Sequence, residues 1–170
     1  VICLLITNDL SAEIRKLYLQ RNYPVLQAEN QYWIGTPIGL YQYNPEDDSF
    51  KPFTLPTAAN NPEVKQLYFY DEWLWCVLDT GLAALHVRLN EWLYFDSSTG
   101  LPSNNVNYID VQEDFIWIAT DQGAARFDQL IEEWEIYNEN RGLPAANVTD
   151  LVVAGDLLWF LFPFQFSEYN

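Results

Sequence analysis

The side chains most able to do chemistry are few in this sequence, and they form no catalytic pattern. The one histidine, His86, ends an apolar run at a point where turn-forming residues are expected. This position favours a turn over the role of a general base. No serine-elbow, paired-histidine or phosphate-loop motif occurs in the sequence. The residue types therefore predict that the protein is not an enzyme, and a hydrolase with paired carboxylates on one face is the less favoured alternative.

Groups suited to metals or cofactors are equally sparse. The acidic turn NPEDDS at residues 44–49 lacks the alternating oxygen ligands and the glycine of a calcium loop, so a solvated hairpin tip is favoured. The two cysteines, Cys3 and Cys76, lie in apolar runs and are predicted to be small buried side chains. Asn147 begins a glycosylation sequon, but Val148 after it belongs to a core pattern. We expect neither a metal nor a cofactor.

Polar side chains that suit ligand binding occupy another set of positions. Asn105 and Asn147 each directly precede a valine of core type, while Asp79 and Asp121 hold equivalent turn positions, the second followed by Gln122. Amide and carboxylate groups can hydrogen-bond the hydroxyls of a polar solute such as an oligosaccharide. The same residue types are also the ordinary composition of loops. These five residues are the predicted ligand-binding set.

A repeat brings these candidates into register. Four tryptophans follow one another at intervals of 42 residues: Trp33, Trp75, Trp117 and Trp159. Other columns keep the same interval, namely Gly39, Gly81 and Gly123; Val64, Val106 and Val148; Phe50, Trp92 and Trp134; and Phe53, Phe95 and Tyr137. A period of this length is typical of stacked β-blades and not of helical arrays.

Each unit contains short strand candidates separated by Gly, Pro, Asn and Asp. In the second unit they span residues 64–70, 73–78, 82–87 and 92–95. The second strand of each unit is apolar on both faces, which in an all-β chain requires sheets stacked face to face. The sequence therefore predicts an all-β fold, a β-propeller built from four 42-residue, four-stranded blades.

We expect one propeller domain over residues 1–170. The fourth unit lacks an outer strand, so the N-terminal segment is predicted to complete it and to remove an exposed sheet edge. The alternative is that the chain forms an arc of a larger propeller. The units that follow from the interval are 22–63, 64–105, 106–147, and 148–170 together with 1–21.

Composition excludes some partners. The chain has 24 acidic and 8 basic side chains and a formal net charge of -16, which would repel phosphate backbones, so no nucleic acid partner is expected. No stretch approaches the roughly 20 apolar residues of a membrane span, so no membrane insertion by this chain is expected. The opening VICLLI also lacks the basic start and the length of a signal peptide.

The segments WIGTPIGLYQYN at residues 33–44 and GLPSNNVNYIDVQEDFIWIATDQGAARFD at residues 100–128 resemble the two-component regulator propeller repeat, found in extracytoplasmic sensor regions of bacterial hybrid histidine kinases. The tryptophan column, the T-x-x-G spacing and the GLP before the next valine carry the resemblance. It implies a bacterial propeller in a periplasmic or extracellular location, often associated with glycan sensing. The fourth unit departs from the pattern because it has lost both the threonine and the glycine.

These observations predict a non-catalytic recognition or sensor module that binds a polar ligand, with an oligosaccharide as the candidate. In a propeller, the connections between blades and the turns between second and third strands emerge on one loop-rich face. The predicted binding residues belong to that face. The alternative is a scaffold that binds a protein partner through its rim or face.

Overall fold

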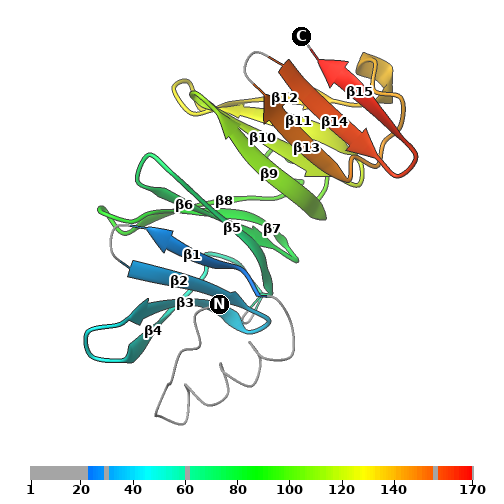
Figure 1. Cartoon of the computed structure of the whole chain (residues 1–170). Coiled ribbons are helices and arrows are strands. Elements are labelled where there is room, and N and C mark those ends of the chain that lie inside the picture. The colour runs from blue at the N-terminus through cyan, green and yellow to red at the C-terminus, as the bar shows by residue number, and fades with distance from the viewer. Residues whose placement is uncertain (1–22, 29–30, 60–61, 155–156, 170) are drawn as a thin grey trace.

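Four antiparallel sheets form the fold in a computed structural model that describes residues 23–28, 31–59, 62–154 and 157–169 (Figure 1). We number the sheets as blades in chain order. Blade 1 contains β1 (Val25–Ala28), β2 (Gln31–Thr36), β3 (Gly39–Asn44) and β4 (Ser49–Phe53). Blade 2 contains β5 (Val64–Tyr70), β6 (Trp73–Leu78), β7 (Gly81–His86) and β8 (Glu91–Phe95).

Blade 3 contains β9 (Val106–Gln112), β10 (Phe115–Thr120), β11 (Gly123–Asp128) and β12 (Glu133–Tyr137). A short 3-10 helix, η1 (Glu139–Arg141), leads to blade 4, which contains β13 (Asp150–Ala154), β14 (Leu157–Phe162) and β15 (Gln165–Tyr169). In every blade the strands pair with their chain neighbours. The all-β fold with four repeated sheets is therefore confirmed. The predicted completion of blade 4 by residues 1–21 lies outside the described residues.

Turn chemistry explains where the strands of each blade end. The third strands of blades 1 to 3 begin at Gly39, Gly81 and Gly123, with φ of 120°, 139° and 130°. A side chain at Gly123 would overlap the carbonyl oxygen of Tyr137 on the outer strand, so this turn needs glycine for space as well as for its backbone angle. The positive φ at all three positions explains why the repeat keeps glycine in this column.

The T-x-x-G spacing has its own physical cause. Thr36 and Thr120 are almost fully buried, and the hydroxyl of each donates a 2.8 Å hydrogen bond to the carbonyl oxygen of the glycine three residues later. The Thr120 hydroxyl oxygen also accepts from the N–H of Gln122 at 3.2 Å. The threonine therefore closes the turn from inside, and Asp121 and Gln122 are left at its tip.

The hydrophobic core lies between neighbouring blades. Trp33, Trp75 and Trp117 are 1–2% exposed, and each belongs to the core that its blade forms with the next one. Trp159, in the same column, is only half-buried, and its ring lies 5.5 Å from that of the exposed Phe166. The side chains of the first three tryptophans therefore project from their own blade toward the next one. Burial in a blade interface is confirmed for its first three members.

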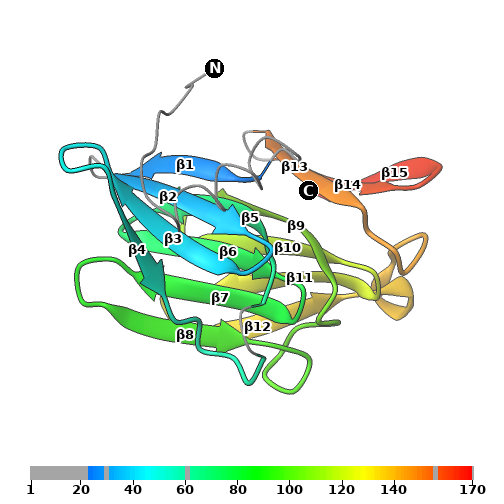
Figure 2. The same cartoon turned by 90° about the horizontal axis from the view of Figure 1, so that it is seen from below.

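The blades follow one another in space as they do in sequence. Figure 1 shows them along a curved row, with blade 1, blue to cyan, at one end and blade 4, orange to red, at the other. Within blades 1 to 3 the strands run in chain order across each sheet (Figure 2). The first strands are neighbours, because β5 contacts β1 and β9, and β9 contacts β13. These first strands form the inner side of the row.

Candidate binding face

The antiparallel register brings the blade-connecting loops and one set of turns to the same end of the sheets. In blade 2, Val64 at the start of β5 pairs with Leu78 at the end of β6, and Leu82 near the start of β7 pairs with Phe95 at the end of β8. The loop before the first strand, the turn between second and third strands, and the exit from the outer strand therefore lie together. We call this end of the blades the loop face. All five predicted binding residues lie on it.

In blade 3, the loop face joins two of the predicted residues directly. The Asn105 side-chain amide donates a 3.2 Å hydrogen bond to Oδ2 of Asp121, and the backbone N–H of Asp121 points to the carbonyl oxygen of Asn105 at 3.4 Å. Oδ1 of Asp121 is buried and has no hydrogen-bond partner. The carboxylate is therefore held in place through one oxygen, and its second oxygen is able to accept a further hydrogen bond.

The other predicted residues do not repeat this pair. In blade 2 the Asn105 position is Glu63, so only a backbone bond forms, from the N–H of Asp79 to the carbonyl oxygen of Glu63 at 3.2 Å. In blade 4, Asn147 accepts from the side-chain amide of Asn107 at 3.3 Å, and that amide also donates to the carbonyl oxygen of Val148 at 2.7 Å. The equivalent positions are shared, but their contacts differ from blade to blade.

The structure also brings polar atoms to this face that sequence reasoning missed. Among the described residues, four buried side-chain oxygens have no hydrogen-bond partner: Gln66 Oε1, Thr80 Oγ1, Asp121 Oδ1 and Asn138 Oδ1. All four belong to the loop-face end of blades 2 and 3. Gln66 was missed because it lies within β5, where a break in register separates it from Val64. Thr80 and Asn138 directly adjoin strands and carry no motif that distinguishes them from ordinary turn residues.

A second polar group ties the inner strands together. Asp110 on β9 accepts from its neighbour Val111 N–H at 2.8 Å and from Val153 N–H on β13 at 3.4 Å. Burial raises the pKa of Tyr68 on β5, and the Asp110 carboxylate, to which the Tyr68 hydroxyl is hydrogen-bonded, raises it further. Burial also raises the pKa of Tyr108, with the charges of Asp110 and Asp150 adding to the effect. Asp110 therefore links blades 2, 3 and 4 and has a structural role.

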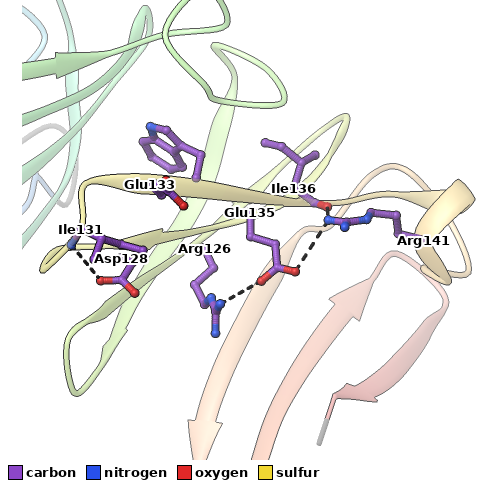
Figure 3. Close-up of a pocket in the computed structure, with 8 residues that line it drawn as sticks. Arg126, Asp128, Ile131, Glu133, Glu135, Ile136 and Arg141 are labelled. Carbon is purple, nitrogen blue, oxygen red and sulfur yellow. Dashed lines mark hydrogen bonds and ion pairs between the residues drawn. The ribbon is translucent and has the colours of Figure 1, made fainter.

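A pocket of about 450 Å³ lies along β11 and β12 of blade 3 and includes Arg141 from the connection to blade 4 (Figure 3). Its centre is Glu135, whose Oε2 is 2.9 Å from Nη2 of Arg126 and whose Oε1 is 3.7 Å from Nη1 of Arg141. Arg126 also stacks over the Phe115 ring at 4.3 Å. None of the predicted binding residues lines this pocket.

In the described part of the chain, the groups considered for catalysis and metal binding lie at separate positions, and Nε2 of His86 is 3.6 Å from Oε2 of Glu72. His86 ends β7, its Nδ1 accepts from Leu89 N–H at 3.5 Å, and its ring meets the Trp73 ring edge-on at 4.9 Å. Its predicted place at a turn is confirmed. The part of the chain that the structure describes holds no group of three or more metal-ligating side chains. Cys76 is fully buried, as predicted, and its burial raises the pKa of the thiol. Among the described residues, no helix has the length and apolar character to cross a bilayer.

Comparison with known proteins identifies the class of fold. No family model matches the sequence, and a search of curated proteins finds no match either. Solved structures do match, and among them are propeller-like extracellular domains with TM-scores of 0.69. They confirm that the chain has a propeller-type arrangement of repeated sheets.

Two of the matching structures are bacterial. One is the extracellular domain assigned to the hybrid two-component system BT3049 of B. thetaiotaomicron, 18% identical, with a match that covers 81% of this chain and 21% of that one. Another is the extracellular domain of BT4673 from the same organism, 21% identical over 86% of this chain and 20% of that one. This chain therefore spans about a fifth of each of those domains. The computationally designed Ika4 protein is 11% identical, with a TM-score of 0.65 and coverage of 88% and 91%.

Proposed function

We propose that this chain is a non-catalytic recognition module of a bacterial sensor, located outside the cytoplasm, that binds a polar ligand at the loop face of blades 2 and 3. The observation that carries the proposal is the group of four buried side-chain oxygens without partners at that face. A buried polar atom left unpaired costs about 1–3 kcal/mol, so native proteins rarely keep several together. A ligand that donates hydrogen bonds to them would remove this cost.

The chemistry of these atoms favours the class of ligand. Three of the four oxygens belong to an amide or a carboxylate and can only accept hydrogen bonds, so the ligand must supply donors. Sugar hydroxyls are such donors, and they need no positive charge. The net charge of -16 disfavours an anionic ligand. A neutral oligosaccharide is therefore the ligand class that we propose.

Two further observations support a sensing role. Two of the similar solved structures are extracellular domains assigned to bacterial two-component systems, which agrees with the resemblance in the repeat. Two of the three carboxylates that line the pocket in blade 3 are engaged, because Glu135 pairs with Arg126 and Asp128 accepts from the Leu130 N–H at 2.9 Å. This arrangement does not favour a hydrolase.

The test compares the parent chain with a double variant, Asp79→Ala with Asp121→Ala, on a glycan array and then by calorimetry with any glycan that binds. We expect binding to weaken at least about tenfold, because the variant removes a positioned acceptor and the adjacent carboxylate. Asp79 is exposed, and the half-buried Asp121 accepts only one side-chain hydrogen bond within the described residues, from the exposed Asn105, so the melting temperature should stay close to that of the parent.

A matched control is Glu91→Ala with Asp114→Ala, which removes the same charge from exposed positions at the opposite end of blades 2 and 3. This control should bind as the parent does. Equal losses in both double variants would show that only net charge matters. A folded parent that bound no glycan would contradict the proposed ligand class, and a loop-face variant that lost several kcal/mol of stability would show that these carboxylates are structural.

A further inference from the structure

The turn between β14 and β15 carries an aromatic side chain at its tip. Phe164 is fully exposed, more so than any other large hydrophobic side chain in the described part of the chain. It stands 42 residues after Gln122, and Pro163 before it stands where blade 3 has Asp121. Strand pairing ends with Phe162 opposite Gln165, so this turn is the one that lies at the loop face in blade 4. An apolar ring therefore takes the place of a polar side chain on that face.

The same turn position is open to solvent in complete blades. Ile38 in blade 1 and Gln122 in blade 3 are both exposed, although an outer strand and a following blade are present there. The smaller Thr80 of blade 2 is half-buried. An outer strand therefore runs past this turn without enclosing the side chain at its tip. The same geometry leaves the ring of Phe164 accessible beside an outer strand.

A two-residue bridge holds this turn next to the turn of blade 3. The N–H of Val148 donates to the carbonyl oxygen of Thr120 at 3.0 Å. The N–H and the hydroxyl of Thr149 both donate to the carbonyl oxygen of Leu161, at 2.8 and 3.1 Å. The two carbonyl oxygens, which directly precede the turns of blades 3 and 4, are therefore at most about 10 Å apart. Figures 1 and 2 both show the β14–β15 turn on the side of blade 4 where the chain arrives from β12.

Polar groups of opposite character adjoin this bridge. Asn147, directly before it, is exposed. Its counterpart Asn105 donates its amide to Asp121, but Pro163 in blade 4 has no carboxylate to receive the amide of Asn147. On the blade 3 side, Oδ1 of Asp121 is a buried acceptor without a partner. A single exposed ring is common on protein surfaces. Here the ring stands beside a hydrogen-bond donor and an acceptor on the same face.

We propose that Phe164 is the platform on which one sugar ring of the ligand stacks, so that the binding site continues from blade 3 onto blade 4. This inference rests on the proposed function, and it narrows the ligand to glycans whose pyranose rings have an apolar face of C–H groups, as glucose and galactose units do. Such a face packs against the aromatic ring and excludes water from both surfaces. The hydroxyls at the edge of the sugar remain available to Asn147 and Asp121.

The test measures binding of neutral oligosaccharides built from glucose or galactose units to the full 170-residue chain, first on an array and then by calorimetry. We expect Phe164→Ala to weaken binding at least about tenfold, because it removes the stacking surface. Phe164→Tyr keeps the ring and should bind within about threefold of the parent. All variants should keep the denaturation midpoint of the parent, because the side chain is fully exposed.

A matched control is Phe166→Ala, which removes another exposed ring from the same hairpin, inside β15 and away from the turn tip. It should bind as the parent does. Equal binding by Phe164→Ala, with binding lost in the Asp79→Ala and Asp121→Ala double variant, would overturn the platform alone. Loss in Phe164→Ala without loss in the double variant would support the platform and contradict the acceptor site of the proposed function. A parent chain that bound none of these glycans would overturn both.

Discussion

Replacement of tryptophan by alanine should lower the free energy of unfolding by different amounts at two positions of the tryptophan column. Trp117 is 2% exposed and lies between blades 3 and 4, with its ring 5.6 Å from that of Tyr137 and 6.2 Å from that of Phe160. Trp117→Ala therefore removes a fully packed side chain and leaves a cavity, at a cost of about 3–5 kcal/mol. Trp159→Ala removes a half-buried ring whose neighbour Phe166 is 69% exposed. We expect it to cost about 1–2 kcal/mol.

Urea denaturation followed by far-UV circular dichroism would measure both values against the parent chain. A lower midpoint with an unchanged slope would show a loss of stability without a change in the denatured state. A Trp117→Ala variant within about 1 kcal/mol of the parent would refute the assignment of this column to the core. If that variant also lost a ligand, the column would be a binding surface. A Trp159→Ala variant as costly as Trp117→Ala would show that another element covers the end of blade 4.

Two further predictions concern the turns and the inner strands. Gly123→Ala should lower the free energy of unfolding by about 1–3 kcal/mol more than Gly39→Ala does. Both positions need positive φ, but only at Gly123 would the new Cβ overlap a backbone carbonyl oxygen. Equal shifts of the denaturation midpoint in the two variants would contradict this prediction. Burial and the Asp110 carboxylate raise the pKa of Tyr68, so the folded state holds this proton more tightly than the unfolded state, and stability should fall as pH rises above about 10. Tyr68→Phe should reduce that fall, and stability that stayed constant to about pH 11 in the parent would contradict the assignment.

The fold could be predicted closely because the sequence repeats the pattern of one blade several times. The strands expected in the second unit at 64–70, 73–78, 82–87 and 92–95 are β5, β6, β7 and β8, with ends that differ by at most one residue. One copy alone would have left strand ends uncertain, but the interval transfers turn signals from one unit to the next. The departure of the fourth unit was also visible, since Pro163 and Phe164 stand where Asp121 and Gln122 stand in blade 3.

The candidate site could be predicted only in part. The loop face followed from the alternating direction of antiparallel strands, so the positions of Asp79 and Asp121 were accessible from sequence. Their contacts could not be predicted. Glu63 in blade 2 stands where Asn105 stands in blade 3. The side-chain hydrogen bond of blade 3 is therefore replaced in blade 2 by two carboxylates, which cannot hydrogen-bond each other. The place of Gln66 at the loop face could not be predicted from the sequence for another reason. Its environment depends on a break in the β5 register, which no residue type in that strand signals.

The departures from the repeat carry more information about function than the columns it keeps. Every blade must pack on its neighbours, so tryptophan, glycine and valine recur for reasons of packing and turn geometry. Arg126 stands where the earlier units have Gln42 and Ala84, and Glu135 stands where they have Lys51 and Leu93. The resulting ion pair lies on the side of blade 3 that blade 4 leaves partly uncovered, where a partly exposed pair contributes little to folding.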